Sequence, residues 1–284
     1  MRFSLTLAVT SPNKLLPINY QYELHSWIYS VLRTADADYS RFLHDRGYLN
    51  GHHGFKLFTF SPLHIQPFHL HKQTQQIEIL SERVTLLLSF WIDDAAEHFI
   101  KGLFADQEFR LGARLPGSRY AQVDFGVQCI EAMPRPVFTN TMRYRCVSPV
   151  MVTHRGDDER YARYLSPEAP GYGDYFIKNL VEKYGACVLP TPGRGELAHT
   201  YHRWSGFGGE IGGEWQEAAP VFALLNTPRK KGIHIKQHTP RHTQLIGYLY
   251  DFALMAPPAL HELGYYAGFG EKNSLGFGCV EVVK

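Results

Sequence analysis

The fold is decided by the stretch RFSLTLAVTSPNKLLPINYQYELHSWIYSVLRTA, residues 2–35. In its first eight residues the apolar side chains recur at every second position, which is the period of a half-buried strand. Residues 20–35 then carry apolar side chains three or four positions apart, which is the spacing of an amphipathic helix. The stretch therefore predicts a strand that is followed by a helix.

The segments that follow continue this alternation through the first half of the chain. Asp36 or Asp38 can cap a second short helix, and Gly47 is well placed to end it. Asp93 opens a further helical segment. Strands are predicted at residues 55–61, 84–91 and 122–130. The order strand, helix, strand, strand, helix, strand is that of the ferredoxin-like arrangement.

The second half begins a similar cycle after Pro134 and Pro136, which predict a linker. Helices are expected at residues 173–184 and 257–268, and strands at 144–152, 231–236, 246–254 and 279–284. Residues 189–214 are rich in glycine and proline and have no sustained period, so they are either an insertion or an elaborated hairpin. The whole chain is therefore predicted to be of the α+β class.

Composition limits the possible environments and partners. The longest apolar runs are interrupted well before the roughly 18 residues of a membrane span, and the N-terminus lacks the continuous apolar core of a signal peptide. We therefore expect a cytoplasmic protein without a membrane partner. The four cysteines form no CxxC pair, which argues against a zinc ribbon. A net charge of +2 neither requires nor excludes a nucleic-acid partner.

The most distinctive local feature is GFGEKNSLGFG, residues 268–278, hereafter the glycine loop. Such a loop can present backbone N–H groups to a phosphate. A dinucleotide-binding fingerprint would need a helix after the glycines, but only six residues follow Gly278. The ending of a Walker loop is also missing. The alternative is a tight turn that merely joins a last helix to a last strand.

The glycine loop resembles the C-terminal signature of the CRISPR repeat-RNA processing endoribonucleases, which belong to the repeat-associated mysterious protein (RAMP) superfamily. The opening strand and the segments YQYELHSWIYSVL, SRFLHDRGY and FKLFTFSPL, at residues 20–32, 40–48 and 55–63, resemble the start of the same family. The resemblance implies two tandem ferredoxin-like (RRM-like, βαββαβ) domains, which we place at residues 1–137 and 138–284.

The resemblance also implies a function and partners. The family cleaves precursor CRISPR RNA within each repeat, so CRISPR repeat RNA is the expected partner. Subunits of a CRISPR effector complex and a second copy of the chain are further candidates. The superfamily also contains members that hold RNA without cutting it, and a non-catalytic RNA-binding subunit is therefore the alternative.

RNA can be cut without a metal or other cofactor when its own 2′-hydroxyl attacks the neighbouring phosphate, which leaves a 2′,3′-cyclic phosphate and a 5′-hydroxyl. This reaction needs a base, an acid and a cation. Some members of the family use a set of one tyrosine, one histidine and one lysine. The resemblance places Tyr29, His44 and Lys56 at the matching positions of this chain. The carbonyl end of a short helix would favour an imidazolium at His44, which suits a proton donor.

Each of these residues also has a purely structural explanation. Tyr29 shares a helix stripe with Tyr22 and His25, so its ring could simply pack there. Lys56 could be a solvated charge at a strand edge, and the role of His44 could be simply to cap a helix end. His25 is the main rival of His44 for the catalytic role.

The fifteen histidines raise the question of a metal site, above all at His52 and His53 and at His69 and His71. Neither pair has carboxylate or cysteine companions at ligand spacing. We therefore expect surface or RNA-facing histidines and no metal site.

Two segments are candidates for RNA binding. The glycine loop contributes Gly268, Phe269, Gly270, Lys272, Asn273, Ser274, Gly276 and Gly278. The basic cluster contributes Arg229, Lys230, Lys231 and Lys236, with His238 nearby, although it could equally be a solvated strand face. Bases could stack on the aromatic rings Tyr265, Tyr266, Phe269 and Phe277, of which Phe269 and Phe277 could instead belong to the core.

Overall fold

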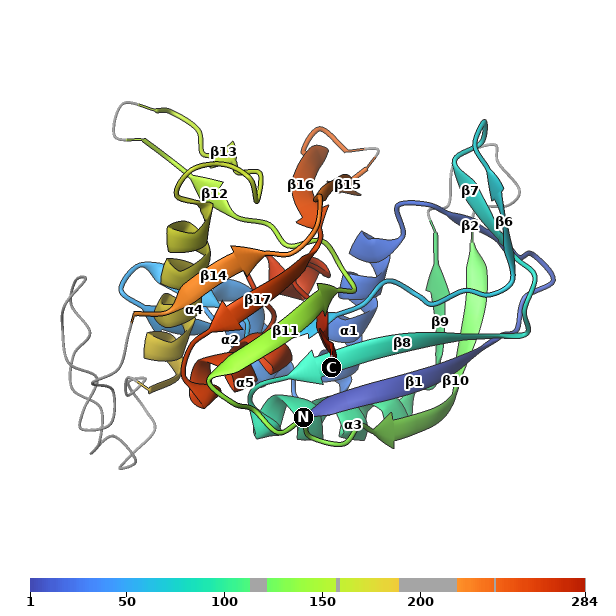
Figure 1. Cartoon of the computed structure of the whole chain (residues 1–284). Coiled ribbons are helices and arrows are strands. Elements are labelled where there is room, and N and C mark those ends of the chain that lie inside the picture. Colours follow the sequence, from blue (N-terminus) through green and yellow to red (C-terminus); the bar gives the residue numbers. More distant parts are fainter. Residues whose placement is uncertain (113–121, 157–158, 189–218, 238, 284) are drawn as a thin grey trace.

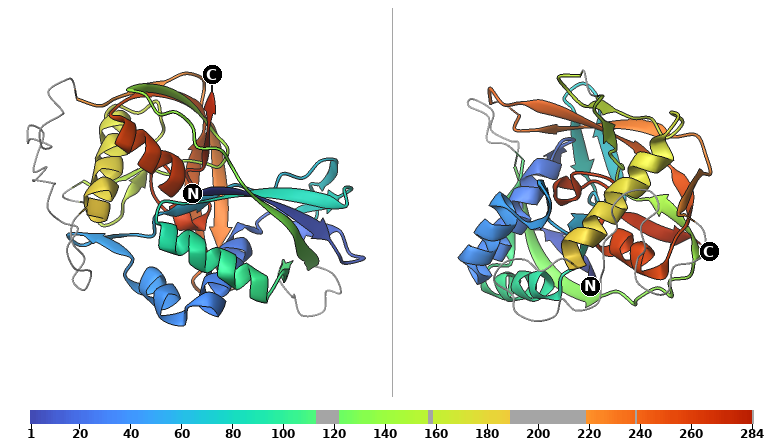
Figure 2. Two further views of the ribbon diagram at one scale, coloured as in Figure 1. Left: turned by 90° about the horizontal axis from the view of Figure 1, so that it is seen from below. Right: turned by 90° about the vertical axis from the view of Figure 1, so that its left-hand side faces the viewer.

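A computed structural model describes residues 1–112, 122–156, 159–188, 219–237 and 239–283 (Figure 1). The predicted insertion at residues 189–214 lies outside the described residues. The chain forms two main antiparallel sheets, each with its helices on one face, and several short hairpins at their margins (Figures 1 and 2).

The first main sheet contains β1 and the strands that follow it in the N-terminal half. Its order is β5 (Phe58–Phe60), β8 (Arg83–Phe90), β1 (Arg2–Val9), β10 (Val123–Ala132) and β9 (Glu108–Leu111), and all neighbours are antiparallel. Without the edge strand β9, this is the 2-3-1-4 order of a ferredoxin-like sheet. Helices α1 (Gln21–Ala35) and α3 (Asp93–Ala105) pack together in the crossover positions. The N-terminal fold prediction is confirmed.

The second main sheet repeats the same topology. Its order is β14 (Val221–Leu224), β17 (Asp251–Met255), β11 (Thr141–Cys146) and β18 (Val280–Val283). Its crossover helices are α4 (Tyr172–Val188) and α5 (Pro258–Ala267). The predicted class of two tandem ferredoxin-like folds is therefore confirmed. The domain boundary at residues 137 and 138 falls between β10 and β11 and stays a prediction.

Two predicted strands have different limits in the structure. The predicted strand at residues 55–61 is divided, because Leu57 has a φ of 55°. Its first residue ends β4 (His53–Phe55), which forms a hairpin with β3 (Tyr48–Asn50), and only β5 belongs to the main sheet. Residues 246–254 are divided at Tyr250 between β16 (Thr243–Leu249) and β17. Strand β16 pairs with β15 (Arg229–Ile235), whereas β17 belongs to the second main sheet. Alternation of apolar residues cannot reveal a change of pairing partner.

The remaining short elements lie outside the two main sheets. A three-stranded sheet of β2 (Leu15–Pro17), β7 (Gln76–Ile79) and β6 (Phe68–His71) was not predicted. The predicted strand at 144–152 ends at Cys146, and β12 (Thr153–His154) pairs with β13 (Arg163–Tyr164). Helix α2 (Ala37–Asp45) is capped by Asp36, whose carboxylate accepts from the Tyr39 N–H, and not by Asp38.

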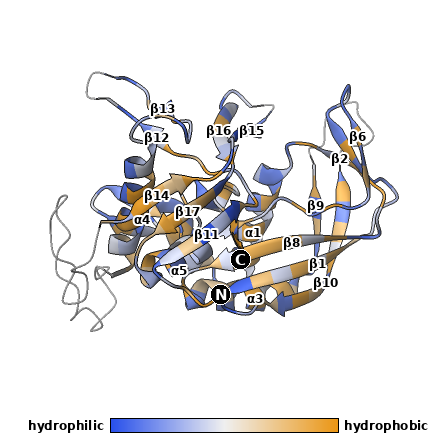
Figure 3. Cartoon of the chain, viewed as in Figure 1, coloured by the Kyte–Doolittle hydropathy of each residue, from blue (hydrophilic) through white to orange (hydrophobic). Residues whose placement is uncertain are grey.

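The two halves share one continuous hydrophobic core. Buried Arg2 of β1 reaches across it and donates to the Ser89 hydroxyl and to the backbone carbonyls of Tyr265 and Val280. Because each of its three nitrogens donates to an acceptor, the buried guanidinium ties the first strand to the last helix and the last strand. Apolar residues follow the sheet strands β1 and β8, and hydrophilic ones gather on the outer loops (Figure 3).

Helix α4 belongs to the second half and packs against the first. It contacts β3 and β4 on one side and α5 and β14 on the other, and Figure 2 shows it between the blue N-terminal helices and the red C-terminal elements. No helix among the described residues is long and apolar enough to cross a membrane.

Candidate active site

A cavity of about 760 Å³ opens where the two halves meet. One wall consists of α1, the end of α2 and the segment after β4, and the other consists of the glycine loop, α4 and β12. The predicted residues Tyr29, His44 and Lys56 all line it. The tip of the glycine loop, Lys272, Asn273 and Ser274, lines it as well. The structure thus brings together residues that lie more than 200 positions apart in the chain.

Tyr29 projects from α1 into this cavity with a half-buried ring. The ring contacts Phe58 and, edge-on, His44, with both centroid distances at 5.8 Å. Burial raises the pKa of the Tyr29 hydroxyl well above its usual range, although a hydrogen bond with the Ser274 side chain acts in the opposite direction. The hydroxyl therefore stays protonated near neutral pH and can donate a hydrogen bond. It is unsuited to act as a base.

His44 and Lys56 form a connected pair at the cavity rim. The His44 side chain is 69% exposed, and its Nδ1 lies 2.9 Å from the Asp45 carboxylate. Because a carboxylate accepts hydrogen bonds, this contact places a proton on Nδ1. Lys56 Nζ donates to the His44 carbonyl at 2.7 Å. Burial lowers the pKa of Lys56, nearby Asp45 raises it, and Lys272 across the cavity lowers it.

His25 lies one helical turn before Tyr29 and also lines the cavity. Its ring is 4.7 Å from the Tyr29 ring, and its Nδ1 is 2.5 Å from the Ser274 carbonyl. Since a carbonyl accepts, Nδ1 carries the proton. Burial lowers the pKa of His25 to about 4, so the imidazole is neutral near pH 7 and its Nε2 is unprotonated. His25 and His44 both contact the Tyr29 ring.

The glycine loop is much more buried than a loop that binds RNA along its whole length would be. Phe269 has no exposed surface and packs against Tyr144, Phe176 and Phe252. Phe269 therefore cannot stack on a base, which corrects the RNA-binding role predicted for it. The other proposed stacking rings, Tyr265, Tyr266 and Phe277, are buried too. The loop glycines are likewise buried: Gly268, Gly270, Gly276 and Gly278. Only the tip reaches the surface, with Lys272 the most exposed.

The glycines are needed because the loop folds closely on itself. Gly278 has a φ of +77°, and a Cβ there would lie 2.0 Å from the Phe269 carbonyl oxygen. No other residue type can adopt this conformation in that space. Asn273 completes the closure by donating from Nδ2 to the carbonyls of Phe269 and Phe277. The loop is a rigid backbone frame that presents a short polar tip to the cavity.

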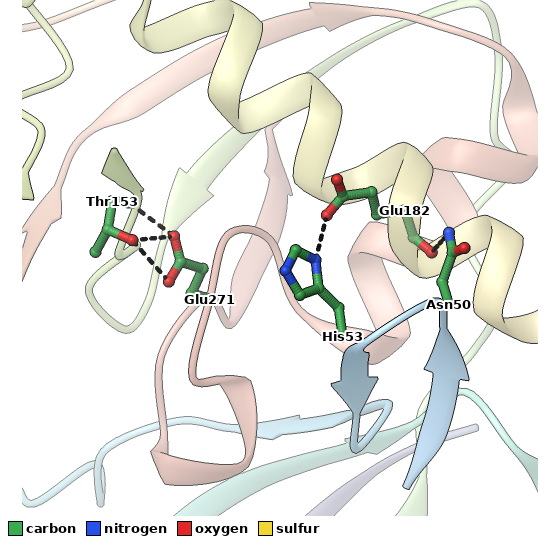
Figure 4. A network of polar contacts seen from close by, with 5 residues as sticks. All are labelled: Asn50, His53, Thr153, Glu182 and Glu271. Carbon is green, nitrogen blue, oxygen red and sulfur yellow. Dashed lines mark hydrogen bonds and ion pairs between the residues drawn. The ribbon is translucent and has the colours of Figure 1, made fainter. Parts of the chain in front are cut away.

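Two charged residues that the sequence analysis missed hold this frame in place. Lys183 of α4 is only 2% exposed, and its Nζ donates to the carbonyls of Gly268 and Gly270. Burial lowers the pKa of Lys183 to about 7, against the effect of nearby Glu271. Glu271 accepts from the backbone N–H and the hydroxyl of Thr153 (Figure 4). A lysine on the apolar stripe of a helix was the only signal in the sequence.

The β3–β4 hairpin is fastened to the same helix. Asn50 Nδ2 donates to the Glu182 carbonyl at 2.9 Å, and His53 Nδ1 lies 3.2 Å from the Glu182 carboxylate (Figure 4). This hairpin directly precedes Lys56 in the chain. Adjacent residues of α4, Glu182 and Lys183, therefore anchor both walls of the cavity.

The two histidine pairs considered as metal ligands lie in different parts of the molecule. His52 and His53 line the cavity. His69 and His71 lie together on β6 with rings 4.7 Å apart, and His71 pairs with Glu78. Within the part of the chain that the structure describes, no group of three or more histidine, cysteine or acidic side chains is arranged to hold a metal ion.

The basic cluster lies apart from the cavity. Arg229, Lys230 and Lys231 are exposed on β15, and none of them lines it. Lys236 lines a separate depression beside Trp27 of α1. His238 lies outside the described residues. The predicted RNA-binding residues thus lie in separate places, and among them only the tip of the glycine loop lines the cavity.

The fold is shared with two solved structures. It superposes on a solved structure described as an RAMP protein binding different RNA substrates, with a TM-score of 0.75, 20% identity and full coverage of both chains. A solved structure of a Cas6-related gene product from Pyrococcus furiosus also gives a TM-score of 0.75, at 21% identity, over 100% of this chain and 98% of that one.

Sequence comparison shows the family to which the chain belongs. The model described as CRISPR associated protein Cas6, C-terminal, matches residues 133–282, and the Cas6 N-terminal model matches residues 15–115. The chain belongs to the CRISPR-associated Cas6 family. It is 28% identical over 283 residues to a CRISPR-associated endoribonuclease Cas6 of Methanocaldococcus jannaschii, covering 99% of this chain and 92% of the relative.

Proposed function

We propose that this protein is a metal-independent endoribonuclease that cleaves precursor CRISPR RNA within its repeats. The observation that carries the proposal is the cavity in which Tyr29, His44 and Lys56 meet the glycine loop tip. The Cas6 relative that matches nearly the whole chain is named as an endoribonuclease, and this supports RNA cleavage as the reaction class.

The chemistry requires one proton to leave the 2′-hydroxyl and one to reach the 5′-oxygen. The 2′-oxygen forms a bond to phosphorus, and the bond from phosphorus to the 5′-oxygen breaks, which yields a 2′,3′-cyclic phosphate and a 5′-hydroxyl. In our proposal His44 donates the proton to the leaving 5′-oxygen. The neutral imidazole of His25 is the candidate base, because its Nε2 is unprotonated near pH 7.

The remaining polar groups stabilise the charge that develops on the phosphorane. Lys56 and Lys272 approach the cavity from opposite walls, so a phosphate between them would meet a cation on each side. The protonated Tyr29 hydroxyl can donate to a non-bridging oxygen. Partnership with effector-complex subunits and formation of a homodimer stay predictions.

The proposal is tested with repeat RNA encoded beside the gene, compared with the same RNA carrying one 2′-deoxyribose at the cleavage site. We expect one cut per repeat in the all-ribose RNA, products with cyclic phosphate and 5′-hydroxyl ends, and full activity in excess EDTA. The deoxy RNA should bind but not be cut. Loss of activity with EDTA would contradict metal independence, and binding without any cleavage would support the non-catalytic alternative.

A further inference from the structure

The cavity extends well beyond the proposed catalytic residues along one face of α4. Tyr175, Lys178, Asn179 and Glu182 all line it and recur three or four positions apart. Residues at this spacing share one face of a helix. The neighbouring stripe of Phe176 and Leu180 is buried in the core. Helix α4 therefore turns a polar and aromatic face toward the cavity.

An aromatic pair stands at this end of the cavity. His154 of β12 packs on Tyr175 with ring centroids 4.5 Å apart and an angle of 36° between the planes. Both rings are half-buried, and both line the cavity. This differs from Phe269, Tyr265 and Phe277, which are enclosed by the core. Half-exposed rings are the surface on which nucleobases stack in single-stranded RNA complexes.

The groups around this pair suit a nucleotide. Lys178 is exposed one turn along the helix, and within the described residues it has no carboxylate partner at ion-pair distance. It can therefore meet a phosphate without first breaking an ion pair. Asn179 Oδ1 is buried and has no hydrogen-bond partner in the described part of the chain. The fold thus leaves one amide acceptor unpaired in the cavity wall, and buried polar atoms rarely stay unpaired.

The size of the cavity agrees with a larger occupant than one phosphate. Its volume of about 760 Å³ lies in the upper part of the range for whole ligands. Tyr29, His44 and Lys56 line one part of it, and the face of α4 with His154 lines another. RNA that places its scissile phosphate beside Tyr29 would extend toward α4.

We propose that His154, Tyr175, Lys178 and Asn179 form a binding subsite for a nucleotide that flanks the scissile phosphate. The base stacks on the Tyr175 and His154 rings, the Asn179 amide contacts the base edge, and Lys178 contacts the phosphate. This subsite rests on the proposed function and deepens it, because it assigns part of the RNA affinity to residues outside the catalytic set.

The first test is the affinity of the uncleavable 2′-deoxy RNA for Tyr175→Ala. Loss of one base stack should weaken binding roughly 5- to 100-fold, whereas Tyr175→Phe, which keeps a ring, should bind nearly as the wild type does. The matched control is Tyr161→Ala, which removes a tyrosine that is 72% exposed and does not line the cavity. Thermal unfolding of each variant verifies that the fold is intact.

The second test separates contact with RNA from support of the fold. The RNA is shortened one nucleotide at a time from each side of the cleavage site. Once the flanking nucleotide is absent, Tyr175→Ala and the wild type should bind equally. A loss that is the same for every RNA length would overturn the subsite.

The third test addresses Lys178. Lys178→Ala should reduce by about one the slope of log affinity against log salt, because one phosphate contact is lost. The control Lys101→Ala changes an exposed lysine of α3 that pairs with Glu97, and it should leave the slope unchanged. An unchanged slope for Lys178→Ala would remove the phosphate contact. A wild-type protein that binds the RNA but never cuts it would contradict the proposed function and leave the subsite standing.

Discussion

The two walls of the cavity are built in opposite ways. The N-terminal wall presents side chains: His44 is 69% exposed, and Lys56 reaches the rim from a short connecting segment. The C-terminal wall includes the backbone frame of the glycine loop, whose glycines and Phe269 are buried. The comparison indicates that a substitution of a side chain in the N-terminal wall should change the reaction, whereas a substitution of a buried glycine of the loop should change the fold.

The largest effect is expected at His44. Because the His44 side chain is exposed and its polar contact is with the neighbouring Asp45, His44→Ala should leave thermal stability and RNA affinity close to the wild type. Cleavage under single-turnover conditions should fall roughly 10²- to 10⁴-fold, the usual contribution of a positioned proton-transfer group. His69→Ala, an exposed histidine on β6, is the control and should retain full activity. Wild-type cleavage by His44→Ala would contradict the assignment of His44 as the proton donor.

The glycine loop provides the opposite case. Gly278 and Gly51 both have left-handed φ values, +77° and +59°, but only Gly278 has a backbone oxygen in the place of a Cβ, while Gly51 faces open space. Gly51→Ala should therefore lose about 1–2 kcal/mol of unfolding free energy, the cost of the conformation alone. Gly278→Ala should lose about 1–3 kcal/mol more from the steric clash.

Urea denaturation of the two glycine variants measures this difference. Equal losses would show that the loop can relax around a methyl group. The contrast between a rigid backbone frame in one wall and exposed side chains in the other would then fail.

The smallest effect concerns His25, whose contact with Ser274 joins the two walls. Burial holds its folded pKa near 4, below the ordinary value of 6.5. Above pH 6.5 the ring is neutral in both states and contributes no pH dependence. As the pH falls from 6.5 towards 4, the unfolded chain binds a proton that the folded protein does not, so stability is lost.

His25→Asn should remove this part of the acid sensitivity. The wild type should lose more unfolding free energy than the variant between pH 7 and pH 4.5, by a few kcal/mol at most. His64→Asn changes an exposed histidine and should follow the wild type. Parallel curves for the wild type and His25→Asn would mean that the imidazole is already solvated in the folded protein.

Much of the secondary structure was predictable because it depends on local periodicity. The strand at β1, the helices α1 and α3 and the Asp36 cap follow from side-chain spacing and capping chemistry. The break at Tyr250 was not predictable, because apolar side chains alternate through β16 and β17 although the two strands belong to different sheets. Pairing partners are long-range contacts and leave no mark on the period.

The candidate site was predictable in part for a similar reason. Tyr29, His44 and Lys56 were identified by a family resemblance, and the tertiary structure brings them to one cavity. Lys183 was missed because a lysine is usually exposed, and only the meeting of α4 with the glycine loop gives its ammonium two carbonyl acceptors. Phe269 was wrongly predicted to bind RNA, because its burial depends on rings from three other elements and cannot be read from its own segment of the sequence.

The sequence by itself determined the order of the main strands and helices, the glycine-rich turn between the last helix and the last strand, and the residue types that proton transfer requires. These depend on a residue and its near neighbours in the chain. The tertiary structure alone decided which of those residues share a cavity, which face of α4 lines it and which loop residues are enclosed. Burial and contact arise from segments far apart in sequence, and a side chain acquires its exposure, its hydrogen-bond partners and its pKa only when those segments meet.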